Sequence, residues 1–72
     1  MDLFETDEKQ RLRREAAAAR LHEIADAIAS HNAIDLERDG RRVTVHVPDE
    51  VDFKLEVEIG DGEGELEIEL TW

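Results

Sequence analysis

The stretch that decides the fold covers residues 51–72 and reads VDFKLEVEIGDGEGELEIELTW. Apolar residues alternate with polar ones in both of its halves, which is the period of a β-strand with one apolar face. They occupy odd positions from Val51 to Ile59 and even positions from Leu66 to Trp72. The Gly-rich segment 60–64 lies between them. The stretch therefore predicts a β-hairpin with one apolar and one acidic face.

The change from odd to even positions also predicts how the two strands pair. Apolar residues can share a face only if they lie opposite one another, so we expect a loop with an even number of residues and Ile59 opposite Leu66. The same register pairs Val57 with Ile68, Leu55 with Leu70, Phe53 with Trp72, Glu58 with Glu67 and Glu56 with Glu69.

Trp72 ends this pattern and has two interpretations. Its position in the alternation indicates that it closes the core against Phe53. Alternatively it is an exposed anchor for a partner, because chain ends fray and Trp is common at the centre of interfaces.

Two further strands are expected upstream. Ile34 and Leu36 alternate with acidic residues, and Val43, Val45 and Val47 alternate with Thr44 and His46. The Asp39-Gly40 dipeptide between them is typical of a tight hairpin turn and would place Leu36 opposite Val43 and Ile34 opposite Val45. Pro48 ends the second strand, since it has no N–H to donate. Residues 33–72 thus predict a four-stranded antiparallel meander.

Residues 12–31 have helical periodicity. The apolar residues that recur on one stripe are Ala17, Leu21, Ile24, Ala25 and Ile28. Arg13 is a poor N-cap, whereas Asn32 tolerates the left-handed conformation that ends helices. We expect this helix to cover the sheet in an α+β fold, with residues 1–11 as an N-terminal segment or extra edge strand.

The composition is strongly acidic. In 72 residues there are 20 Asp and Glu against 9 Lys and Arg, a net charge of −11, and Lys9 and Lys54 are the only lysines. This balance resembles that of proteins from organisms with molar salt in the cytoplasm, where self-repulsion is screened. Such a protein is surrounded by non-specific monovalent cations.

The small size of the chain and its lack of cysteine limit the ways in which the fold can be stabilised. A chain of this length has a small core, and without disulfides or thiolate metal sites self-association is the expected remedy. The residues after Met1 lack a basic region and a long apolar run, so we expect no signal peptide and a cytoplasmic protein. The negative charge argues against general nucleic-acid or membrane binding.

Several segments in order resemble the amphi-Trp domain, a family of small prokaryotic proteins common in halophilic archaea. They are Leu21-His22-Glu23-Ile24-Ala25-Asp26, Gly40, Val47-Pro48-Asp49-Glu50-Val51 and Glu65-Leu66-Glu67-Ile68-Glu69-Leu70-Thr71-Trp72. The resemblance implies one domain over residues 1–72 that ends in an amphipathic strand with a terminal Trp. It implies no activity, cofactor or catalytic residue.

Two charged clusters suggest alternative functions. Lys9, Arg11, Arg13 and Arg14 form a basic cluster that would suit a nucleic-acid-associated regulator. The acidic sheet face, with Glu56, Glu58, Glu67 and Glu69, could bind a cation or small molecule, or dock a cationic protein.

Catalytic and metal-binding patterns are not found. The histidines have no metal-ligand spacing, and Ser30, the sole serine, belongs to no catalytic constellation, so we expect no metal, no cofactor and no enzyme. The leading hypothesis is a non-catalytic protein-interaction or self-assembly module, with Trp72 among its candidate contact residues.

Overall fold

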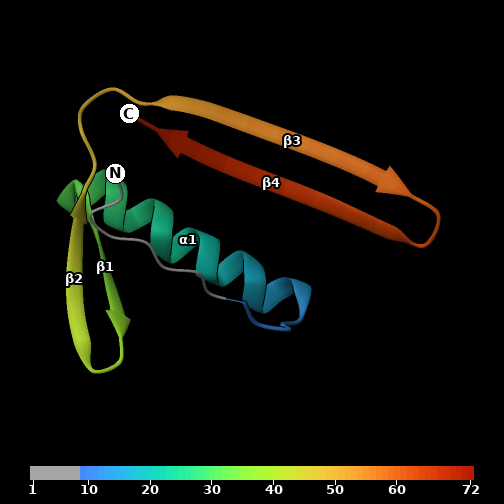
Figure 1. The fold of residues 1–72 in the computed structure, drawn as a ribbon, viewed down its shortest axis with the longest axis horizontal. Helices are drawn as coiled ribbons and strands as arrows, with labels where there is room; N and C mark the ends of the chain where they lie inside the picture. The colour runs from blue at the N-terminus through green and yellow to red at the C-terminus, as the bar shows by residue number, and fades with distance from the viewer. Residues whose placement is uncertain (1–8) are drawn as a thin grey trace.

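The computed structural model describes residues 9–72, so the suggested N-terminal edge strand within residues 1–11 falls mostly outside the described residues. One helix is followed by four antiparallel strands (Figure 1), which confirms the α+β class. The elements are α1 (Arg14–His31), β1 (Ala33–Arg38), β2 (Arg41–His46), β3 (Asp52–Gly60) and β4 (Glu63–Thr71).

The helix α1 begins at Arg14 rather than at Leu12, and its start has little side-chain support. Arg13 has the extended backbone of an N-cap, with φ −68° and ψ 153°, but its side chain makes no capping hydrogen bond. The Ala17 N–H donates to the Arg13 carbonyl at 2.9 Å and closes the first turn. At the other end Asn32 adopts the left-handed conformation, with φ 56°, as its residue type predicts.

The first hairpin has the predicted register. Leu36 lies opposite Val43 and Ile34 opposite Val45. Asp39 and Gly40 have φ values of 51° and 76°, as a two-residue type I′ turn requires. On the face opposite to Leu36 and Val43, the Thr44 hydroxyl donates to an Asp35 carboxylate oxygen at 2.6 Å.

The second hairpin has a different register from the predicted one. A two-residue turn at Asp61-Gly62 joins its strands, and Gly62 takes the required positive φ of 71°. The strands therefore continue through Gly60 and Glu63, and every pairing shifts by two positions. The observed pairs on the apolar face are Phe53 with Leu70, Leu55 with Ile68, Val57 with Leu66 and Ile59 with Gly64.

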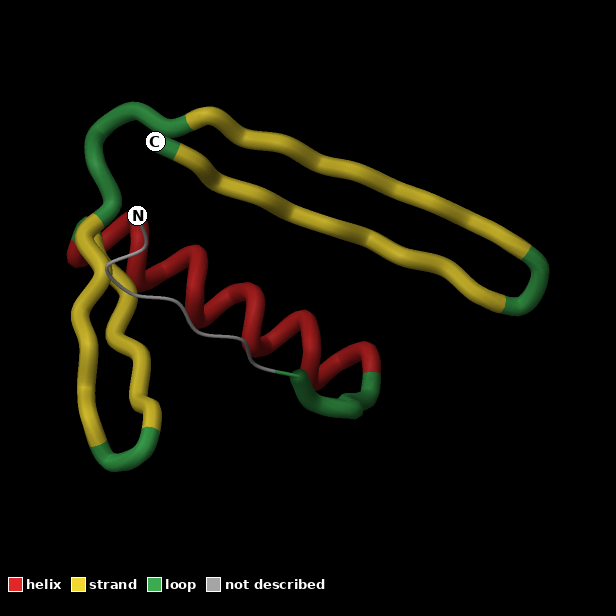
Figure 2. Tube along the Cα trace, viewed as in Figure 1, coloured by secondary structure: helices red, strands yellow, loops and turns green. Residues whose placement is uncertain are grey.

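The four strands form two separate two-stranded sheets rather than one continuous sheet (Figures 1 and 2). The chain leaves the first sheet at residues 47–51, where Pro48 cannot donate to a ladder. Among the elements that the structure describes, the helix contacts β1, while β3 and β4 contact only each other. We expected the helix to cover all four strands, but it does not cover β3 and β4.

Little of the described chain is buried. Ala33, where β1 follows α1, is the one buried apolar residue within residues 9–72. The radius of gyration is 14.1 Å, whereas a compact chain of this length would have about 11 Å. The chain is thus a small helix–hairpin unit with a second, projecting hairpin.

Candidate interaction surface

The projecting β3–β4 hairpin carries one continuous apolar face. Residues alternate across a strand, so the odd positions of β3 and the even positions of β4 point to the same side. We call this set the apolar hairpin face; its members are Val51, Phe53, Leu55, Val57, Ile59, Gly64, Leu66, Ile68, Leu70 and Trp72.

The apolar hairpin face is exposed along its whole length. Ile59 is 82% exposed, Phe53 65% and Leu66 62%, and only Leu70 is half-buried. Full burial of one such side chain contributes about 1.5–3 kcal/mol, so the uncovered face forgoes several kcal/mol of stabilisation. Contiguous exposed apolar patches of this kind mark interaction sites in folded proteins.

Trp72 does not close a core against Phe53. Phe53 pairs with Leu70, and the continued register places Trp72 beside Val51, past the last ladder pair. The residue is 64% exposed, so within this chain Trp72 is an exposed part of the face. We call the end of the hairpin away from the turn its open end. A shallow hollow of about 270 Å³ there is lined by Glu50, Val51, Asp52, Thr71 and Trp72.

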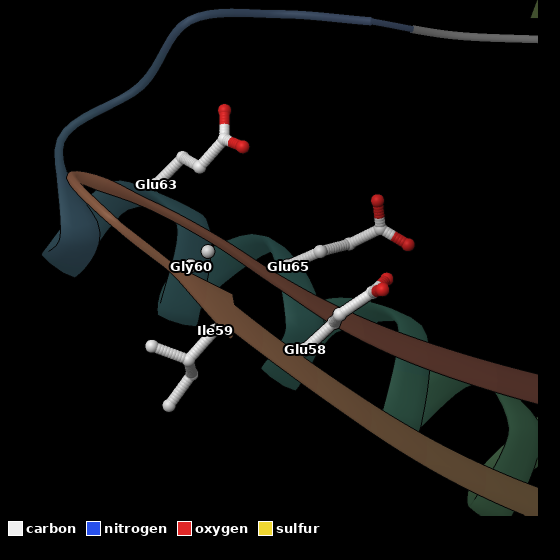
Figure 3. Close-up of a pocket in the computed structure, with 6 residues that line it drawn as sticks. Glu58, Ile59, Gly60, Glu63 and Glu65 are labelled. Carbon is white, nitrogen blue, oxygen red and sulfur yellow. The ribbon is translucent and has the colours of Figure 1, made fainter.

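The turn end of the same hairpin is narrow on its apolar side. Ile59 lies opposite Gly64, so this pair presents one side chain where the other pairs present two. A Cβ on Gly64 would have ordinary contact, 3.7 Å, with the Glu58 carbonyl oxygen. Figure 3 shows Ile59 pointing to one side of the ribbon and the carboxylates of Glu58, Glu63 and Glu65 to the other.

The opposite side of the hairpin is the acidic face predicted from the sequence, with different partners. Glu56 lies opposite Glu67 and Glu58 opposite Glu65, while Glu69 lies opposite Lys54. The Lys54 ammonium also lies 3.7 Å from a Glu56 carboxylate oxygen. Directly opposed carboxylates destabilise a strand pair by about 0.2–1 kcal/mol each.

The basic cluster lies at the start of the helix. Arg13 occupies the N-cap position, and Arg14 forms an exposed ion pair of 3.4 Å with its neighbour Glu15. Lys9 and Arg11 are exposed and precede the helix. No Phe, Tyr or Trp is found on residues 9–31, so the described part of this cluster lacks a large aromatic platform on which bases could stack.

A second concave surface lies between the C-terminal half of α1 and the first hairpin. It is an open groove of about 700 Å³, and His31 and His46 both contribute to its lining together with Ile24, Asp35 and Thr44. Among residues 9–72, no group of three His, Cys, Asp or Glu side chains is placed to hold a metal ion. This groove is open, and its lining is more apolar than polar.

The sequence interpretation missed the role of Gly64 at the end of the apolar face. The signal was present, because Asp61-Gly62 repeats the Asp39-Gly40 turn dipeptide of the first hairpin. Treating the whole segment 60–64 as loop hid the fact that Gly60 and Gly64 belong to strands.

Comparisons with known proteins give one result. The family model described as the Amphi-Trp domain matches residues 1–72. No curated protein and no solved structure matches the chain. Within the described residues, no helix is long and apolar enough to cross a membrane.

Proposed function

The chain belongs to the Amphi-Trp domain family, and we propose that it is a non-catalytic protein-interaction module that docks through the apolar hairpin face. The observation that carries this proposal is the exposure of that face. Phe53, Leu66 and Trp72 are each more than three-fifths exposed, although Phe53 and Leu66 belong to one regular, paired hairpin and Trp72 directly follows it. A binding partner would remove this apolar area from water.

The architecture supports this use of the hairpin. A two-stranded hairpin is marginal by itself in water and gains stability when its apolar face packs on another element. Here α1 contacts β1 and leaves β3 and β4 without a packing layer among the described elements. The missing layer is what an interaction partner would supply.

We further propose that the protein works in the cytoplasm of a cell with high internal salt. The carboxylate pairs Glu56–Glu67 and Glu58–Glu65 repel one another, as does the chain's net charge of −11. At about 1 M salt the Debye length is about 3 Å, which screens this repulsion and leaves apolar association intact.

The test uses purified protein in molar KCl. Size-exclusion chromatography with light scattering and affinity capture compare the natural chain with Leu55→Asp, which places a charge in the middle of the apolar hairpin face. Glu67→Asp, on the acidic face, is the control. We expect a complex, with itself or with another protein, that Leu55→Asp abolishes and Glu67→Asp retains. A natural chain that is monomeric and captures nothing would overturn the proposal.

A further inference from the structure

We propose that a second copy of the chain covers the apolar hairpin face, with Trp72 of each copy seated over Gly64 of the other. This inference rests on the proposed function and specifies its partner. The apolar hairpin face is bulky at the end that carries Trp72 and lacks one side chain at its turn end, where Ile59 lies opposite Gly64.

The face tapers along the hairpin. At its open end, Trp72 and Phe53 present two aromatic side chains beside Val51 and Leu70. At its turn end, Ile59 stands alone because its partner Gly64 has no side chain. A partner surface that fits must therefore be hollow at one end and bulky at the other.

A second copy has this shape when the two hairpins pack face to face and run in opposite directions. The required symmetry is a two-fold axis between the faces and perpendicular to the strands, the commonest symmetry of homodimers. This axis places β3 over β3 and β4 over β4, with the central pair Leu55–Ile68 over its own copy. Trp72 of one copy then lies over Gly64 of the other, since these two positions end the same strand edge at equal distance from the centre.

The area of the face suits such a dimer. The exposed large apolar residues of the face have exposed fractions between 36% and 82%. Together they present an apolar area on the order of 500 Å² per copy. Two copies would bury on the order of 1,000 Å² of apolar surface. Stable interfaces bury about 1,200–2,000 Å² in total, and homodimer interfaces are about 65% apolar, so the two quantities agree.

The charge distribution permits contact between two acidic copies and argues against a cationic partner at this face. No member of the apolar hairpin face is charged, and the register places the glutamates of both strands on the opposite side, as Figure 3 shows for Glu58, Glu63 and Glu65. Two sheets packed face to face lie about 10 Å apart, so the carboxylate rows would remain on the outer surfaces in solvent. Association of this kind strengthens with salt, whereas docking of a cationic partner weakens.

The chain offers a matched pair of variants for the test. Gly60 and Gly64 flank the same turn, neither has a positive φ, and an added Cβ meets ordinary contacts at both. Gly64→Leu fills the hollow on the apolar face, while Gly60→Leu adds the same side chain on the acidic face. Sedimentation equilibrium in molar KCl would measure the dimer dissociation constant, with circular dichroism to verify the hairpin.

The single tryptophan reports on its own position. In the natural chain we expect a dimer whose Trp72 emission shifts to longer wavelength on dilution. Gly64→Leu should weaken dimerisation about tenfold or more, because overfilling a packed site costs about 1–3 kcal/mol. Gly60→Leu should leave the dissociation constant within about threefold, and Gly64→Leu combined with Trp72→Ala should recover part of the loss.

Each other outcome overturns the inference in a distinguishable way. A dimer that Gly64→Leu and Gly60→Leu weaken equally would refute the seating of Trp72 over Gly64. A monomer that binds a different protein through Leu55 would refute the second copy and leave the proposed function standing. A monomer with a solvent-shielded Trp72, or one that binds nothing, would refute both.

Discussion

Phe53 lies opposite Leu70 in the β3–β4 ladder, so Trp72 extends beyond the last pair instead of packing on Phe53 across the strands. Burial against Phe53 would have made Trp72 a core residue whose removal costs about 3–5 kcal/mol. The observed exposure of 64% assigns it to the surface of the single chain.

We expect Trp72→Ala to change the stability of the dissociated chain by less than about 1 kcal/mol, because most of the indole is already in water. Urea denaturation followed by circular dichroism, at protein concentrations below the association range, is the measurement. Leu70→Ala provides the comparison and should cost more, since Leu70 is half-buried. A loss of about 3 kcal/mol or more for Trp72→Ala would show that the ring is buried within one chain.

The helix start offers a stabilising change. Arg13 has N-cap backbone geometry but no capping hydrogen bond from its side chain. Arg13→Ser should therefore raise the free energy of unfolding by about 0.5–2 kcal/mol, since a serine hydroxyl can accept from the free N–H groups of the first turn. Arg14→Ser, one residue inside the helix, removes the same charge without supplying a cap and should give no such gain. If both variants raise the free energy of unfolding equally, the gain comes from the lost charge and not from a cap.

The first hairpin turn depends on left-handed backbone at Gly40. Its φ of 76° and the open space around its Cα mean that Gly40→Ala introduces conformational strain without a steric clash. We expect a loss of about 1–2 kcal/mol in thermal or urea unfolding. Gly60→Ala, at a strand position without positive φ, should cost less, and the reverse order would contradict the turn assignment.

The sequence predicted local structure well where a single pattern, such as alternation or a turn dipeptide, allows one arrangement. Alternation defined all four strands, and Asp39-Gly40 defined the register of the first hairpin, because a two-residue turn leaves one pairing that keeps Leu36 and Val43 on the same side. The second register failed for a physical reason. Moving every pair by two residues keeps the apolar and acidic faces unchanged, so periodicity cannot distinguish the two arrangements.

The separation of the two sheets could not be predicted from periodicity either. An apolar strand face indicates that something covers it, but not whether the cover is a helix of the same chain or another molecule. The stripe on α1 and the face on β3–β4 are both compatible with one layered domain. The geometry of the segment 47–51 decides whether β3 continues the first sheet or leaves it. No residue pattern in that segment specifies the direction of the following strand.

The acidic face gives the last prediction, in which position rather than total charge matters. Glu67 lies opposite Glu56, whereas Glu69 lies opposite Lys54. Glu67→Gln therefore removes a repulsive pair and should stabilise the hairpin by about 0.2–1 kcal/mol in about 0.1 M KCl. Glu69→Gln removes an attractive pair and should be neutral or destabilising under the same conditions.

Salt separates this effect from a general response to net charge. At about 1 M KCl and above the Debye length is about 3 Å or less, so the difference between Glu67→Gln and Glu69→Gln should shrink while the natural chain becomes more stable. Thermal unfolding of the three proteins across a KCl series measures both trends. Equal stabilisation by the two variants at low salt would mean that the cross-strand partners Glu56 and Lys54 do not govern the energetics, because both variants change the net charge by the same amount.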